Sequence, residues 1–297
     1  MQQYTKPPKK LEDQIELLKN RGLVIQNEAE AQEFLSRVNY YRFSAYCLPF
    51  EEMRHKFIRN TKFEQIVQLY NLDTQLRFAL SKSLEIIENL LRAKIAYFFS
   101  LKYGTFFHED SQYFFQSKSF NHKEWLDTVH KEIMRSREIF VDHYKNKYSG
   151  FPKMPLWMAV ELMSFGSLSL MYNNLLKNDK IDFSKKLGNF HSDILSSWMH
   201  SFSYVRNICA HHGRIWNKGL GIKMQLPKAQ EWKIIDNTKI AAVIFAINQF
   251  LQLTFVNSSL IECWKNEMET VLDSFIEIGF YREIGLPEDY KNHNLWK

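Results

Sequence analysis

Residues 63–103 contain neither proline nor glycine, and their apolar side chains recur at steps of three and four residues. Such spacing places apolar side chains on one face of an α-helix. It predicts one long helix, or two nearly collinear helices, burying that face. Glu88 and Arg92 lie four residues apart in the order that favours pairing along a helix, and we interpret them as a surface or interhelical ion pair. The apolar repeat consists of Ile66, Tyr70, Leu76, Leu80, Leu84, Ile87, Leu91 and Ile95.

The rest of the chain also shows helical patterns, and we find no convincing alternation typical of strands. Glycine and proline number only 10 and 7 in 297 residues, which disfavours a turn-rich β fold. The predicted class is all-α, with an N-terminal helical extension over residues 1–60 and a helical-bundle domain over residues 61–297. Apolar spacing, caps and breakers predict further helices over residues 11–20, 27–38 and 123–145, from Pro155 through Glu161, from Ser192-Asp193 onward, and over residues 238–256 and 260–278.

Charge and cysteine content limit the classes of protein that this chain can represent. Lys and Arg number 39 against 33 Asp and Glu, a formal charge of +6, which allows an anionic partner without requiring one. The widely spaced cysteines, Cys47, Cys209 and Cys263, predict no disulfide framework. The most apolar run, Ile240–Val256, contains Asn248 and is shorter than the roughly 20 residues that a membrane span needs. We therefore expect a soluble cytoplasmic protein with no membrane partner.

One short segment, residues 205–217, gathers side chains that suit proton transfer and anion binding: VRNICAHHGRIWN. On a helix that begins at Ser192-Asp193, two stripes run toward this segment. The apolar stripe, expected to be buried, consists of Trp198, Phe202, Val205 and Cys209. The polar stripe contains no acid, has Arg206 beside it, and consists of His200, Tyr204, Asn207, His211 and Arg214. This composition is more typical of a face that binds an anion than of a face that is merely exposed to solvent.

Arg206, Asn207 and His211 are the candidate catalytic residues. Histidine accepts and returns a proton near neutral pH, and the guanidinium fork of arginine matches two phosphate oxygens. Asn207 lies one turn before His211 and can orient the imidazole or the ligand. These groups suit cleavage of a phosphodiester without a metal or other cofactor. His211 would assist proton transfer at the 2′-hydroxyl or the leaving oxygen, and Arg206 would stabilise charge on the phosphate.

The spacing of these residues predicts a site shared between two chains. Five residues on a regular helix separate Arg206 and His211 by about 140° and roughly 7.5 Å of rise. One motif therefore flanks a groove, which a second copy across a two-fold axis would close. His212 is either the functional histidine or a capping residue before Gly213. A zinc site that includes Cys209 is disfavoured, because the other cysteines are distant and unpaired.

The segment R-N-x-C-A-H-H-x-R-x-W-N resembles the signature of bacterial abortive-infection (Abi) proteins of the AbiD/AbiF type, which belong to the HEPN superfamily. The hallmark of that superfamily, Arg followed by four to six residues and His, reads here as Arg206 to His211. Cys47 is a departure from the family pattern, which often has an aromatic residue before the Pro-Phe pair. This departure affects packing of the N-terminal segment and not the chemistry. Other segments resemble family motifs in the expected order: LEDQIELLKNRGLVI, VNYYRFSAYCLPF, LYNLDTQLRFAL with the acids of residues 84–89, and PLWMAVELMSFGSLSLMYNNL.

The resemblance implies a HEPN-type helical bundle and an RNA-cleaving toxin used in phage defence, working without a metal and as a homodimer. It also implies RNA as substrate and partners that can include a small noncoding antitoxin RNA. Arg206 and His211 carry over as catalytic residues and Asn207 as their support. The other residues that match the signature, with less defined roles, are His212 as possible support and Arg214, Trp216 and Asn217 as RNA contacts.

Two further positions carry hypotheses from their residue types. The aromatic run Tyr40, Tyr41 and Arg42 can stack on unpaired bases and contact phosphate, or its tyrosines can pack the N-terminal helices on the core. Glu161 can hold an arginine near the site, or it forms an ordinary interhelical ion pair. An alternative function is a non-catalytic RNA-binding or scaffold protein that uses the same basic groove. A nucleotide-modifying or nucleotide-binding module is disfavoured because the chain has no phosphate-cradling glycine loop.

Overall fold

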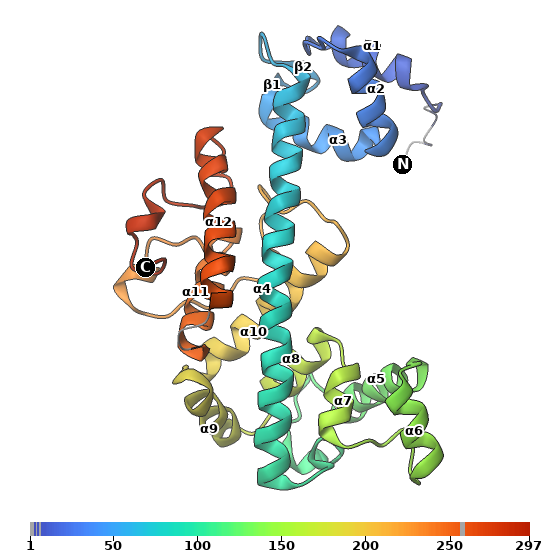
Figure 1. Cartoon of the computed structure of the whole chain (residues 1–297), viewed down its shortest axis with the longest axis vertical. Coiled ribbons are helices and arrows are strands. Elements are labelled where there is room, and N and C mark those ends of the chain that lie inside the picture. Colours follow the sequence, from blue (N-terminus) through green and yellow to red (C-terminus); the bar gives the residue numbers. More distant parts are fainter. Residues whose placement is uncertain (1–2, 4, 6, 256–258) are drawn as a thin grey trace. The chain divides into compact units, whose positions relative to one another are not determined.

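The computed structural model describes residues 3, 5, 7–255 and 259–297, and the chain divides into two compact units, residues 1–75 and 76–297. The fold is all-α, as predicted, and Figure 1 shows its helices in chain order. The predicted domain boundary at residue 60 stays a prediction, because a division by packing does not show where a catalytic domain begins.

The first unit consists of short helices and a β-hairpin, followed by the first turns of the long helix α4 (Phe63–Tyr103). The side chain of Asn27 accepts hydrogen bonds from the backbone N–H groups of Ala29 and Glu30, which confirms the predicted helix start. The aromatic rings of Phe34, Phe43 and Phe63 pack edge-on or tilted in its core. The elements before α4 are α1 (Leu11–Asn20), α2 (Glu28–Arg37), α3 (Tyr40–Cys47), a 3-10 turn at Leu48–Phe50, β1 (Glu51–Met53) and β2 (Lys56–Phe57).

The second unit begins within α4, which is one continuous helix rather than two. Residues 104–116, which follow α4, contain two 3-10 turns, Phe107–Glu109 and Ser111–Tyr113, and no α-helix. The helices that follow are α5 (His122–Arg135), α6 (Ile139–Lys147), α7 (Leu156–Leu162), α8 (Phe165–Asn173), α9 (Lys177–Gly188), α10 (Ser192–Ala210), α11 (Ile240–Thr254) and α12 (Ser259–Glu277), with 3-10 turns at Gln230–Trp232 and Tyr290–Asn292.

Helix α10 is central to the second unit because it packs against α8, α9 and α11 (Figure 1). Its predicted apolar stripe is confirmed, since Trp198, Phe202, Val205 and Cys209 are all buried. In α11, every residue from Ile240 to Leu251 except Gln249 is buried, which explains its apolar sequence. Within the described residues, no helix is both long enough and apolar enough to cross a membrane. The packing of α10 fixes the direction in which its C-terminal end points.

Two predicted helix boundaries were wrong, and a third falls partly outside the described residues. Residues 123–145 form two helices, because the backbone is extended at Ser136, whose Oγ accepts a hydrogen bond from the N–H of Glu138 (3.3 Å). The cap of α10 is His191, whose imidazole accepts from the N–H of Asp193, instead of Ser192-Asp193. Val256, the predicted end of α11, lies outside the described residues.

Candidate active site at the end of helix α10

The C-terminal end of α10 is closed by a tight backbone turn at the paired histidines. His211 is the C-cap, and His212 follows with a positive φ of 54°. The N–H of His212 donates to the carbonyl of Cys209 (3.0 Å), and the N–H of Gly213 donates to that of Ile208 (2.8 Å). This is the Schellman pattern, in which the left-handed position is usually glycine. The structure thus places His212 in the capping position, one of the two roles predicted for it.

His211 is exposed, and its backbone N–H donates to the carbonyl of Asn207 (3.0 Å). Its imidazole makes no hydrogen bond or ion pair within the part of the chain that the structure describes. Asn207 is also exposed, and its Oδ1 accepts a hydrogen bond from Nη1 of Arg206 (3.2 Å). Asn207 therefore links the arginine and the histidine of the motif, one through its side chain and the other through its backbone.

Arg206 is held by a carboxylate that the sequence did not identify as part of the site. Its Nε donates to Oε2 of Glu88 (3.0 Å), and its Nη2 donates to Oε1 (2.9 Å) and Oε2 (3.0 Å) of the same residue. Glu88 lies on α4, and its side chain is only 8% exposed, against 32% for Arg206. The predicted polar stripe contains no acid, but an acid from another helix lies beside it.

Glu88 also binds Arg92, which joins the site to the end of α7. Arg92 Nη2 lies 2.6 Å from Oε1 of Glu88. The Arg92 guanidinium also donates to the backbone carbonyls of Glu161 (2.6 Å) and Met163 (2.9 Å). The last carbonyls of a helix lack partners within the helix, so an arginine is a favourable partner there. We call Glu88, Arg92 and Arg206 the Glu88 cluster. The pairing of Glu88 with Arg92 is confirmed, but the pair lies within α4 and is largely buried, and Arg206 adds the interhelical contact.

A surface pocket of about 350 Å³ opens beside this cluster. Its walls come from α4 and from the C-terminal part of α10, which are the two helices that the ion pair between Glu88 and Arg206 connects. Besides the Glu88 cluster, its lining residues are Ser81, Glu85, Asn89 and Ala210. The pocket gives a ligand access to the side of α10 that carries Arg206.

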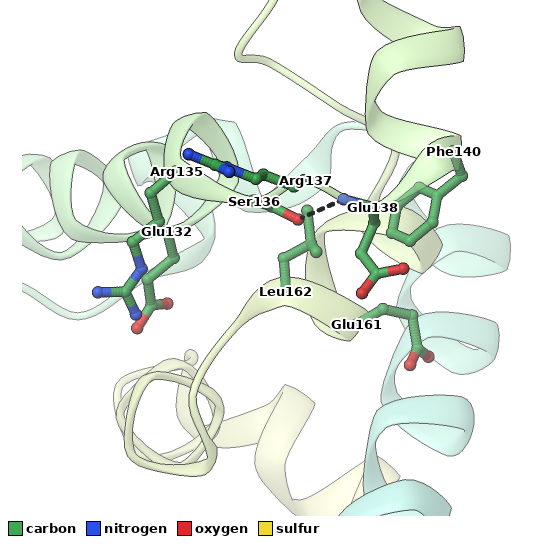
Figure 2. Close-up of a pocket in the computed structure, with 8 residues that line it drawn as sticks. All are labelled: Glu132, Arg135, Ser136, Arg137, Glu138, Phe140, Glu161 and Leu162. Carbon is green, nitrogen blue, oxygen red and sulfur yellow. Dashed lines mark hydrogen bonds between the residues drawn. The ribbon is translucent and has the colours of Figure 1, made fainter.

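Glu161 contacts Arg92, the arginine that shares Glu88 with Arg206. The backbone carbonyl of Glu161 lies closer to Arg92 than its carboxylate does. Its carboxylate lies 3.8 Å from Nη1 of Arg92 and is 54% exposed. The same carboxylate lines a second pocket of about 710 Å³ between α5, α6 and α7. Figure 2 shows it near the carboxylate of Glu138, away from the guanidinium groups of Arg135 and Arg137. The main link from α7 to the site is thus the carbonyl of Glu161, not its side chain.

The residues beyond α10 differ in whether they can meet a ligand. The polar stripe was wrong in its last member, because α10 ends at Ala210 and Arg214 lies beyond the turn. Arg214 and Asn217 are half-buried. Trp216 is fully buried and packs edge-on against Phe280 at a ring distance of 5.4 Å. Its indole is not accessible to stack on a base, so Trp216 belongs to the core and drops out of the set of possible RNA contacts.

The aromatic run of the first unit places its side chains in three different ways. Tyr40 is half-buried, and its hydroxyl accepts a hydrogen bond from Nη1 of Arg21 (2.9 Å). Burial raises the pKa of Tyr40, although Arg21 opposes the shift. Tyr41 is 86% exposed, whereas the Arg42 guanidinium lies 5.7 Å from the ring centre of Tyr70. Tyr41 is thus the member of this run that is accessible for stacking.

The described residues contain no group of three or more His, Cys, Asp or Glu side chains arranged to hold a metal ion. The site at the end of α10 contains an imidazole, an amide and a guanidinium, supported by a buried carboxylate. This set can transfer a proton and stabilise an anion.

Comparison with known proteins identifies one family. A family model described as Abi-like protein matches residues 33–217, a span that contains both Glu88 and the segment from Arg206 to Asn217. The search of curated proteins gave no match, and neither did the search of solved structures.

Proposed function

The chain belongs to the Abi-like protein family, and from this premise we propose that it is an endoribonuclease that cleaves RNA without a metal ion, at Arg206, Asn207 and His211. Family membership supports a role in abortive infection, a bacterial defence against phage. The proposal that the protein is the toxin in this defence, and of HEPN type, goes further. The observation that carries it is the exposed His211 imidazole, one turn after an asparagine that contacts a firmly held arginine.

The proposed reaction is an attack of an RNA 2′-hydroxyl on its neighbouring phosphorus. The His211 imidazole makes one of two proton transfers: it accepts the 2′-hydroxyl proton as the new P–O2′ bond forms, or it protonates the leaving O5′ as the P–O5′ bond breaks. Solvent water makes the other transfer. Arg206 donates hydrogen bonds to the phosphate oxygens, on which charge grows in the transition state. The products carry a 2′,3′-cyclic phosphate and a 5′-hydroxyl.

Other residues are proposed to hold the RNA. Arg214 and Asn217 follow the catalytic turn, and exposed Tyr41, with Tyr40 and Arg42 beside it in sequence, offers a face for an unpaired base. Stacking of this kind tolerates many sequences, because every base has a flat face. A small noncoding RNA that silences the toxin is proposed as a second partner.

We propose that two copies of the chain form the working site. The exposed apolar side chain of Phe78 on α4 offers a contact for a second copy. It lies on the same face of the helix as Glu85 and Asn89, which line the pocket beside Arg206. A two-fold axis near this surface would bring a second motif opposite the first.

The test compares RNA cleavage by wild type, His211→Ala and His212→Gly in the presence of EDTA. Wild type should cut single-stranded RNA, and His211→Ala should lose at least about 100-fold in rate, a typical contribution of a general acid or base. His212→Gly should retain activity, because glycine suits the left-handed backbone at that position. Circular dichroism checks that each variant is folded.

Three outcomes would contradict parts of the proposal. If His211→Ala cuts as fast as wild type, the site is wrong. If no protein cuts RNA but all bind it in a salt-sensitive manner, the chain is a non-catalytic RNA-binding protein. If light scattering shows a fully active monomer, the shared site is wrong.

A further inference from the structure

We infer that Glu88 is a positioning residue for Arg206, and that Arg92 holds Glu88 in place by its attachment to the end of α7. This inference rests on the proposed function, because it assigns Glu88 a role in the same reaction. Glu88 would not touch the RNA, and it would act only through the guanidinium that it orients.

The contacts of Glu88 fix both the place and the orientation of the Arg206 guanidinium. Both carboxylate oxygens bind the Nε and Nη2 edge of Arg206 at 2.9 to 3.0 Å. A planar fork bound in this bidentate way has little freedom to rotate. The remaining nitrogen, Nη1, points toward Asn207, whose Oδ1 accepts from it at 3.2 Å. Arg206 therefore offers its other edge toward Asn207, which precedes His211 by one turn.

Arg92 supplies the rigidity that Glu88 needs. The Arg92 side chain is 13% exposed, and it donates to the backbone carbonyls of Glu161 and Met163 while it pairs with Glu88. Backbone carbonyls at the end of a packed helix are less mobile than side chains, so they hold Arg92 in a fixed position. The chain of contacts therefore runs from α7 through α4 to α10, and it ends at Arg206.

One carboxylate lies between two guanidinium groups in the Glu88 cluster. The Glu161 carboxylate lies 3.8 Å from Arg92, and Glu85 lines the adjoining pocket, so these acids offset the charge of the two arginines. The role of Glu88 therefore rests on the orientation that it gives to Arg206, and not on the net charge of the cluster.

The test is a double-mutant cycle between Glu88→Gln and Arg206→Ala, with RNA cleavage and RNA binding measured on the same samples. Glu88→Gln should lower kcat by about 10-fold to 100-fold and change KM by less than about 3-fold, because a misoriented guanidinium fails mainly in the transition state. In the Arg206→Ala background, the same change should alter kcat by less than about 3-fold. A residue that only stabilises the fold would not show this loss of effect.

Two further variants keep the test decisive. Glu88→Asp retains the charge on a shorter side chain and should recover part of kcat, and it replaces Glu88→Gln if that variant fails to fold. Asp179→Asn removes a buried carboxylate from a different cluster on α4 and α9, and its kcat per folded molecule should match wild type.

The outcomes separate this inference from the proposed function. If wild type cleaves RNA and His211→Ala does not, but Glu88→Gln cleaves at the wild-type rate, the positioning role is wrong while the function stands. A faster Glu88→Gln would also overturn it, because Glu88 would then mask Arg206. Effects of Glu88→Gln and Arg206→Ala that add fully would show two independent roles. No cleavage by wild type would overturn both proposals.

Discussion

Two clusters of charged side chains tie α4 to its neighbours in the second unit, and they have opposite compositions. In the Glu88 cluster, one carboxylate serves two guanidinium groups. Further along the same helix, Lys102 lies 2.8 Å from Asp179 and 2.9 Å from Asp182, so one ammonium serves two carboxylates. The hydroxyl of Tyr103 also donates to Asp179 (2.7 Å). We call this second group the Lys102 cluster.

We propose that the Glu88 cluster serves the reaction and that the Lys102 cluster stabilises the fold. The Glu88 cluster lines a surface pocket and contains Arg206, which belongs to the same sequence motif as the exposed His211. The contacts of the Lys102 cluster join α4 to α9. The hydrogen bond to Asp179 raises the pKa of Lys102, so this lysine stays charged.

The largest expected effect on stability comes from Asp179→Asn. Asp179 is buried and accepts from both Lys102 and Tyr103. Its loss should lower the free energy of unfolding by about 2 kcal/mol, less than the about 3–5 kcal/mol for a fully buried pair, because Lys102 is one-third exposed. Urea denaturation followed by circular dichroism measures this. If Asp179→Asn left the denaturation midpoint unchanged, the Lys102 cluster would not stabilise the fold. If it caused a large loss of kcat in folded protein, the Lys102 cluster would not be purely structural.

A smaller effect is expected from His108, an ionisable side chain that is completely buried. Burial lowers its pKa to about 3, helped by the nearby His130, and the Glu109 carboxylate 3.7 Å away does not reverse the shift. The unfolded chain therefore binds one more proton than the folded chain between pH 6.5 and about 3, and stability falls as the pH falls through that window.

The measurement is the free energy of unfolding at pH 7.0 and pH 5.5 for wild type and His108→Leu. From the linkage relation, His108 accounts for a loss of about 1 kcal/mol over this interval in wild type, and the variant should lose that much less. Equal pH dependence in the two proteins would show that His108 is not held neutral by burial.

The smallest effect is expected from Lys82→Met, which removes an exposed pair between α4 and α12. Lys82 lies 2.7 Å from Glu267, and both side chains are about two-fifths exposed. Exposed pairs contribute little because water and salt screen them. The midpoint of thermal unfolding should not change measurably. A clear shift in the midpoint would mean that an exposed ion pair on α4 contributes to stability as much as a buried one.

Local patterns were sufficient to predict most helices. The apolar repeat predicted α4, the stripe from Trp198 to Cys209 predicted the buried face of α10, and Asn27 predicted the start of α2. Each of these signals depends on residues within one or two helical turns. The break at Ser136 was missed because an ordinary serine, without glycine or proline, leaves the helical conformation there.

The site was predictable only in the part that lies within one segment. Arg206, Asn207 and His211 are neighbours on α10 and its cap, so spacing alone brought them together. Glu88 is 118 residues away from Arg206, and no local pattern connects them. Trp216 shows the opposite error, since it matches a signature of the family but is buried against Phe280. Burial and pairing between distant segments depend on tertiary packing, which spacing does not encode.

The most direct test of the central claim uses the chemistry of the cut itself. An RNA oligonucleotide is mapped with wild type in EDTA, and a matched oligonucleotide then carries a 2′-deoxy nucleotide at the main cleavage position. The account predicts 2′,3′-cyclic phosphate ends on the first substrate and no cleavage at the substituted position on the second. Cleavage at the 2′-deoxy position would contradict it, because no 2′-hydroxyl would be present to attack.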